Sequence, residues 1–233
     1  MDLLLKEEHH QVRETARKFS DEVVGPRARD LDEKEEFPHD TVKQMAELGF
    51  LGLPFPEKYG GAGLDTLAYA IAVEEIARWC GSTAITLAAH VSLGCGPVWL
   101  NGNEEQKQKF LVPMAKGEVL GAFGLTESQA GSDSAGTRTR AEKVDGGYKV
   151  NGSKIYITNG SVAKFITFTA RTKPEDASAM TGALMKLTRG FGAIRRSARR
   201  DSFSALSVRA CCSQSLSAWF SRCNSSTWVF SEK

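Results

Sequence analysis

The 233-residue sequence lacks any uninterrupted apolar run approaching the ~20 residues of a membrane-spanning helix. Its first ten residues, MDLLLKEEHH, turn charged after five positions, which excludes a secretory signal. It also lacks an excess of either charge, because 30 Lys and Arg face 28 Asp and Glu. With 41% apolar residues, this composition is typical of a folded globular chain and excludes disorder, collagen and coiled coil. We therefore expect a cytoplasmic protein with no membrane span.

Several motifs that would assign a function are absent or incomplete. Gly61 and Gly63 begin a dinucleotide-binding pattern, but its third glycine is missing. The sequence contains neither a G-x-S-x-G nor an H-E-x-x-H motif. The neighbouring Cys211 and Cys212 with the single Cys223 lack the paired C-x-x-C spacing of a zinc site. We therefore expect no metal.

The histidines are not expected to be catalytic. His9 and His10 lie on different faces of a predicted exposed helix, where solvated side chains are the commoner case. His90 lies in an apolar helix, and there a hydrogen-bonded core histidine is commoner than a catalytic base.

The first 117 residues predict helices. Apolar residues recur at helical spacing in the first segment, and Gly25 and Pro26 are expected to end it. Asp65 or Thr66 can cap a later helix, because a short side-chain oxygen satisfies free amides of the first turn. A nearly uncharged segment, residues 82–93, is typical of a helix buried among others. We expect helices at residues 2–24, 39–48, 65–79, 82–93 and 104–111.

After Gly117 the pattern changes to short strands. Asp145-Gly146-Gly147 predicts a hairpin turn, and Asn159-Gly160 predicts a second turn. Helices followed by strands favour an α+β fold, with an N-terminal all-α domain and then an antiparallel β-domain. We expect strands at residues 119–125, 141–144, 148–151, 153–158 and 165–171, and domains at residues 1–117 and 118–182.

Residues 183–233 form an atypical basic tail rich in Ser, Arg and Cys. Their net charge is +7, whereas that of residues 1–182 is −5. The tail has no sustained helical or strand period, so we favour a frame change in the coding sequence. A basic appendage that binds an acidic surface is the other account, and sequencing the gene around the codon for Thr181 distinguishes them. Nucleic-acid binding is disfavoured, because the body is acidic and no aromatic-basic motif occurs.

The segment FGLTESQAGSD, residues 123–133, is chemically unusual. A predicted strand ends there, and small and hydroxyl residues follow. Gly131 lets backbone approach a ligand closely, while Thr126, Ser128 and Ser132 offer side-chain partners. Consecutive amides of such a stretch can form a concave anion site. A plain surface loop is the alternative interpretation.

A second segment, VNGSKIYITNG at residues 150–160, strengthens the first interpretation. It places Tyr156 and Thr158 two residues apart, on the same face of a predicted strand. The ring can stack on a flat heteroaromatic cofactor, and the hydroxyl can donate to a ring nitrogen or oxygen. The two motifs in this order predict a cofactor site.

At these residues the chain resembles the acyl-CoA dehydrogenase family, flavoproteins of fatty acid metabolism that oxidise an acyl-CoA to its trans-2-enoyl form. The resemblance covers about residues 1–180 and ends near Thr181. It rests on four blocks: LGFLGLPFPEKYGGAG, NGNEEQKQKFLVPMAKGE, GAFGLTESQAGSD and NGSKIYITNG. It implies an incomplete barrel for the β-domain and a C-terminal helical bundle that is missing here. Ser128 and Gln129 depart from the family, which usually has Pro and a small or polar residue there.

The resemblance implies FAD as the cofactor and assigns its contacts by position. Ser132 would also meet the acyl-CoA thioester, Tyr156 would pack on the flavin, and Thr158 would bond near the nitrogen that accepts hydride. The family's general base is a Glu of the C-terminal domain, so we expect no catalytic residue in this chain. The implied cofactor-binding residues are Phe123, Leu125, Thr126, Gly131, Ser132, Tyr156, Ile157 and Thr158.

The resemblance also implies partners: a short or branched acyl-CoA substrate of β-oxidation, an electron-transferring flavoprotein, and a homotetramer. The missing C-terminal helices argue against the last two here. Without them we expect a truncated chain that binds FAD poorly and turns over little acyl-CoA, since placing the base correctly is worth orders of magnitude in rate. The alternative is a non-catalytic binding or oligomerisation module derived from the family, which co-elution with a full-length homologue would test.

Overall fold

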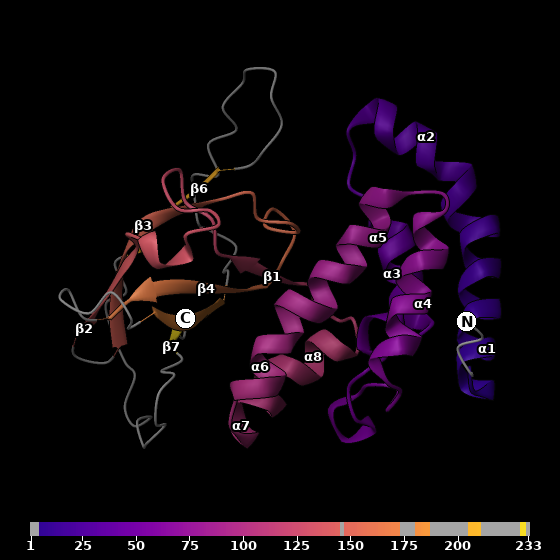
Figure 1. The fold of residues 1–233 in the computed structure, drawn as a ribbon, viewed down its shortest axis with the longest axis horizontal. Coiled ribbons are helices and arrows are strands. Elements are labelled where there is room, and N and C mark those ends of the chain that lie inside the picture. Colours follow the sequence, from indigo (N-terminus) through magenta and orange to yellow (C-terminus); the bar gives the residue numbers. More distant parts are fainter. Residues whose placement is uncertain (1–4, 145–146, 173–179, 187–204, 211–228, 232–233) are drawn as a thin grey trace. The chain divides into compact units, whose positions relative to one another are not determined.

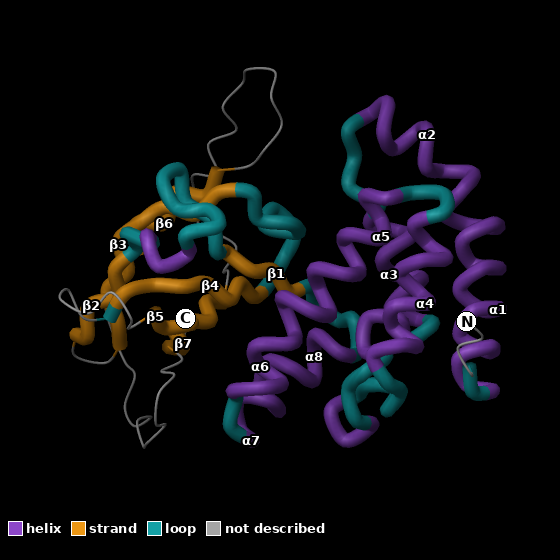
Figure 2. The backbone as a smooth tube through the Cα atoms, viewed as in Figure 1, coloured by secondary structure: helices purple, strands orange, loops and turns teal. Residues whose placement is uncertain are grey.

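The computed structural model describes residues 5–144, 147–172, 180–186, 205–210 and 229–231. The chain divides into two compact units, Met1–Val119 and Leu120–Lys233. Helices make up the described part of the first unit and strands dominate the second (Figures 1 and 2). The α+β fold class is confirmed, and the division falls after Val119, where the sequence predicted it after Gly117.

The ends of the helices follow local chemistry. Asp65 caps α4, because its Oδ1 accepts a hydrogen bond of 2.9 Å from the amide of Ala68. Gly49 follows α3 in the left-handed conformation, with φ of 75°. The helices are α1 (Glu7–Phe19), α2 (Gly25–Lys34), α3 (His39–Glu47), α4 (Thr66–Ala77), α5 (Gly81–Ala88), α6 (Gly96–Asn101), α7 (Glu104–Gln106) and α8 (Val112–Ala115).

Three π-helical segments each precede an α-helix that has proline in its second position. They are Ser20–Val24 before Pro26, Ala89–Cys95 before Pro97, and Lys107–Leu111 before Pro113. The residue before each proline donates its amide to the carbonyl five residues back. Because proline clashes with the carbonyl four residues back, a wider π-turn accommodates it. Our expectation that Gly25 and Pro26 end the first helix was wrong, since the helix continues as α2.

The helix from Gly81 to Asn101 joins α5, a π-segment and α6. By length and composition it could cross a membrane, with a mean hydropathy of 1.3, but 56% of the tested stretch is buried inside the protein. A core helix of a globular protein passes the same test, so this is weak evidence for a span. The absence of a membrane span stays a prediction.

The described strands of the second unit form one sheet, in the order β6-β3-β2-β4-β5-β7, with β1 also beside β4. The expected hairpin is confirmed, because Val144 pairs with Gly147 across an antiparallel ladder. The strands are β1 (Gly121–Gly124), β2 (Arg140–Val144), β3 (Gly147–Ile155), β4 (Phe165–Arg171), β5 (Met180–Lys186), β6 (Ala205–Ala210) and β7 (Val229–Ser231).

The sheet is mixed, where the sequence predicted an antiparallel one. β4 runs parallel to β1 and to the start of β2, and β5 runs parallel to β7. The β2–β3 hairpin lies between β1 and β4 in the chain. β3 runs antiparallel to β2, and the chain reverses once more before β4, so that β4 runs parallel to β1. β6 and β7 fall within residues 183–233, for which we expected no strand pattern, and β6 pairs with β3 from Val150 to Ile155.

Candidate functional site

The first candidate segment begins on β1 and leaves the sheet. Phe123 stands opposite Thr167 of β4, and it is half-buried, as are Leu125 and Thr126. β1 ends at Gly124, so Leu125 and Thr126 lie where the chain turns away from the ladder with β4. Their backbone carbonyls are therefore available to partners outside that ladder.

A tight turn follows. Glu127 and Ala130 exchange two backbone hydrogen bonds, of 2.9 and 3.2 Å, which leaves Ser128 exposed at the tip. Beyond the turn, Gly131 and Ser132 are both exposed. The segment therefore combines a fixed backbone turn with accessible small and hydroxyl residues.

The second candidate segment turns where we expected it to remain a strand. β3 ends at Ile155, and Tyr156 takes a left-handed conformation with φ of 58°. Tyr156 is 59% exposed and Thr158 is exposed, whereas Ile157 between them is buried. The two side chains are thus exposed together, but on a turn and not on one strand face. Ile157 packs with Ala122, Ala163 and Ile166 in a small hydrophobic cluster, which anchors the turn.

The structure brings the two segments together. The amide of Ile155, one residue before Tyr156, donates a hydrogen bond of 2.9 Å to the carbonyl of Thr126. Next to it, Lys154 Nζ donates to the carbonyl of Leu125 at 2.8 Å. The chain therefore holds Leu125 and Thr126 beside the exposed Tyr156 turn. Among the described residues, no hydrogen bond or ion pair joins Gly131 or Ser132 to that turn.

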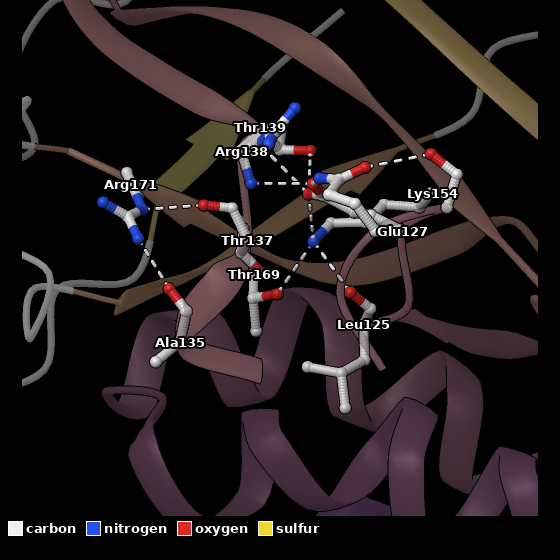
Figure 3. A network of polar contacts seen from close by, with 11 residues as sticks. Leu125, Glu127, Ala135, Thr137, Arg138, Thr139, Lys154, Thr169 and Arg171 are labelled. Atoms are coloured by element: carbon white, nitrogen blue, oxygen red, sulfur yellow. Dashed lines mark hydrogen bonds and ion pairs between the residues drawn. The ribbon is translucent and has the colours of Figure 1, made fainter. Parts of the chain in front are cut away.

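A buried ion pair joins the same segments (Figure 3). Lys154 Nζ lies 2.8 Å from Glu127 Oε1, and the side chains are 3% and 4% exposed. Lys154 also donates to Thr169 Oγ1 at 3.0 Å. Glu127 accepts bonds from the amides of Arg138 and Thr139 and from the Thr139 hydroxyl, at 2.7, 3.0 and 2.6 Å. Both charges are thus paired and hydrogen-bonded, as burial requires.

The surroundings of the pair favour the charged form of Glu127 but disfavour the charged form of Lys154. Burial by itself would raise the pKa of Glu127, but the hydrogen bonds from Lys154, Thr139 and the Arg138 amide outweigh it and lower that pKa to about 2. Burial lowers the pKa of Lys154, and the neighbouring Glu127 offsets only part of this. The carboxylate is stabilised more than the ammonium, because its oxygens accept several donors while Lys154 has one anionic partner among the described residues.

Sequence reasoning did not select Glu127 or Lys154 as important residues, although both lie inside the two motifs. Strand alternation would put Lys154 on the same face as Tyr156 and Thr158, so the sequence carried no signal for its burial. In the structure Lys154 is buried and Tyr156 is exposed, since the left-handed residue changes the direction of the chain. That positive φ has no marker in the sequence, where glycine is the usual residue.

Gly131 shows room for a ligand. A Cβ built at Gly131 would meet no atom of the described chain within 4 Å, and its φ is not positive. Packing and backbone strain therefore do not explain the glycine. This open surface fits a group that approaches the backbone from outside the chain.

Two histidines in the helical unit have structural roles. His90 is fully buried with Nε2 3.1 Å from the carbonyl of Met114, and burial lowers its pKa to about 4, as expected for a core histidine.

Our expectation for His9 was wrong: it is 2% exposed, and its Nε2 lies 3.0 Å from Asp65. With Glu8, these two residues form a cluster that could hold a metal. However, His9 Nδ1 accepts from the Lys6 amide, so Nε2 carries the proton in the neutral ring and is no free ligand.

Comparisons with known proteins identify the family and agree with the fold. The model of the acyl-CoA dehydrogenase N-terminal domain matches residues 6–118, and that of the middle domain matches residues 122–211. The second match continues past Thr181, near which we expected the resemblance to stop, and includes β6. The chain belongs to the acyl-CoA dehydrogenase family.

Individual relatives cover the same part of the chain. A short-chain specific acyl-CoA dehydrogenase of Clostridium acetobutylicum is 50% identical over 74% of this chain and 46% of its own. The structure of butyryl-CoA dehydrogenase from Megasphaera elsdenii matches with a TM-score of 0.77 and 40% identity, covering 80% of this chain and 50% of that one. An acyl-CoA dehydrogenase of Bacillus anthracis complexed with FAD matches with a TM-score of 0.73 and 37% identity, over 80% of this chain and 32% of that one. The chain spans about half the length of the curated relatives it matches.

Proposed function

We propose that the turn after β1 and the Tyr156 turn bind the flavin of FAD. One observation carries this proposal: the hydrogen bond from the Ile155 amide to the Thr126 carbonyl holds the two motifs side by side. Exposed Tyr156 and Thr158 then offer a ring and a hydroxyl to one flat ligand. The open surface at Gly131 supports the fit, as does the solved relative that is complexed with FAD.

Each candidate residue would make a different contact with the flavin. Thr126 and neighbouring amides would bond to the polar edge of the flavin, while Phe123 and Leu125 would line its apolar part. Tyr156 would cover the ring and Thr158 would donate to it. Buried Ile157 would hold the turn in place, because it packs in the cluster below. Gly131 and Ser132 would stand where a ligand can approach the backbone closely.

For the whole protein we propose α,β-dehydrogenation of a short or branched acyl-CoA to the trans-2-enoyl-CoA. When bound, FAD would supply the hydride acceptor for this oxidation. Ser132 would position the thioester, and relatives named short-chain specific and butyryl-CoA dehydrogenase support the substrate size. We assign no general base among the residues present, and propose an electron-transferring flavoprotein as the electron acceptor from the family resemblance.

A titration tests the cofactor proposal. Quenching of FAD fluorescence on addition of the chain would show binding, and Thr158→Val should weaken it while leaving the far-UV circular dichroism unchanged. Gly81→Ala, in the helical unit, is a control that should leave binding unchanged. Because we expect weak binding by this chain, the titration extends to high FAD concentration, and absence of quenching there with the unaltered, folded chain would contradict the proposal. For the whole protein, bleaching of the flavin absorbance by butyryl-CoA tests the reaction.

A further inference from the structure

The contacts between the two motifs involve three consecutive residues of the first. Leu125 is bonded to the side chain of Lys154, Thr126 to the backbone of Ile155, and Glu127 to the side chain of Lys154. Both partner residues, Lys154 and Ile155, are the last two of β3, immediately before the Tyr156 turn. The end of one strand therefore sets the position of the whole stretch.

The pair satisfies itself without any ligand. Lys154 has three ammonium protons and three acceptors, which are Leu125 O, Glu127 Oε1 and Thr169 Oγ1. Neither charge is available to a cofactor, because both side chains are nearly fully buried. A group of this kind can act on a ligand only through the residues that it holds.

We propose that Glu127 and Lys154 are positioning residues: their buried pair locks residues 125–127 onto the end of β3 and so presets the flavin contacts before FAD binds. This inference rests on the proposed function only for the role of the pair in FAD binding. The contacts that hold residues 125–127 are present without FAD. Contacts held in place beforehand cost less to order on binding, which raises affinity.

Hydrogen exchange of the full chain without FAD tests directly whether the pair holds residues 125–127 against the end of β3. Lys154→Met removes the donor to Leu125 and leaves Glu127 without its cation. The amides of Ile155 and residues 125–132 should then exchange about tenfold faster, in line with the loss of a charged hydrogen bond. Amides inside β4, such as Phe168, should change much less.

Arg171→Met is the matched control in the same unit. Arg171 donates two side-chain bonds of 2.7 and 2.6 Å, to the carbonyls of Thr137 and Ala135, and so holds a different segment (Figure 3). It should speed exchange at residues 135–137 and leave Ile155 unchanged. Equal acceleration of the whole sheet in Lys154→Met would show a stabilising pair without a local role, and would overturn the proposal.

The double variant Glu127→Gln with Lys154→Met separates position from stability. It leaves no buried charge unpaired, so urea stability should recover relative to Lys154→Met alone. Fast exchange at Ile155 should persist, because Leu125 still lacks its donor. Recovery of slow exchange together with stability would contradict the positioning role.

FAD affinity is the second readout. If the unaltered chain binds FAD, both Lys154→Met and the double variant should weaken binding about tenfold, as expected for loss of a preset site, while Arg171→Met should not. Equal affinity in all variants would overturn the positioning role. Failure of the unaltered chain to bind FAD would count against the proposed function alone, since hydrogen exchange without FAD still tests whether the pair positions residues 125–127.

Discussion

The backbone amide of Ile155 donates a hydrogen bond of 2.9 Å to the carbonyl of Thr126, across 29 positions of the sequence. It joins two segments that sequence analysis selected separately. One carries small and hydroxyl residues after β1, and the other carries Tyr156 and Thr158. Their juxtaposition is the geometric basis of the flavin proposal.

Gly131→Ala separates ligand binding from folding. Since the added Cβ meets no atom within 4 Å, the free energy of unfolding should change by less than about 0.5 kcal/mol. If FAD approaches the backbone there, its affinity should fall about tenfold through the steric clash. Urea unfolding and FAD fluorescence titration measure the two quantities. Unchanged affinity would remove Gly131 from the site.

Tyr156→Gly tests whether the left-handed turn serves the ligand. Glycine adopts φ of 58° without strain, so unfolding should cost the same or up to about 1 kcal/mol more than in the unaltered chain. FAD binding should weaken, because the ring is lost. Tyr156→Phe keeps the ring and should keep binding. A Gly variant that binds FAD fully would contradict the stacking role of Tyr156.

Acid should destabilise the helical unit through His90. Its pKa is lowered to about 4 from 6.5 because burial disfavours the imidazolium. A folded pKa below the unfolded one means that the neutral ring's contribution is complete above pH 6.5 and is lost as the pH falls toward 4. His90→Gln should flatten the stability profile in this window. Profiles of equal slope for both proteins would contradict this assignment.

The sheet unit should respond at lower pH through Glu127. Its folded pKa of about 2 lies below the ordinary 4.5, so its contribution is complete above pH 4.5 and is lost as the pH falls toward 2. Glu127→Gln should lose this dependence. Exchange at Ile155 and at helical amides, followed against pH, would separate the two windows.

Two glycines of the helical unit form a contrasting pair. Gly117 has φ of 72°, and a Cβ there would overlap that of Ala46 and lie 2.9 Å from Leu51 Cδ1. Gly117→Ala should therefore cost about 2–4 kcal/mol of stability. A Cβ at Gly81 would meet no atom within 4 Å, and Gly81 lies in the first turn of α5. Gly81→Ala should therefore raise the free energy of unfolding by up to about 1 kcal/mol. Urea unfolding of both variants checks the contrast.

The sequence predicted features that depend on near neighbours. The expected cap, Asp65 or Thr66, depends on a few adjacent residues, and the structure has Asp65 in that position. The continuation through Pro26 was missed, because a π-turn replaces the break that proline usually causes.

Features that depend on distant residues were harder to predict. Burial of His9 depends on Asp65, and burial of Glu127 depends on Lys154, so neither follows from local periodicity. The turn at Tyr156 was missed because its left-handed backbone contradicts the ordinary preference of tyrosine. The candidate flavin residues were selected from the motifs, while the pair that holds them was visible only in three dimensions.

Hydrogen exchange of the unaltered chain with and without FAD shows whether the two turns bind the flavin. If they do, residues 123–132 and 155–160 should exchange more slowly at high FAD concentration, with little change in the helices α1 to α4. No slowing anywhere, or slowing confined to segments outside these two turns, would contradict the flavin proposal.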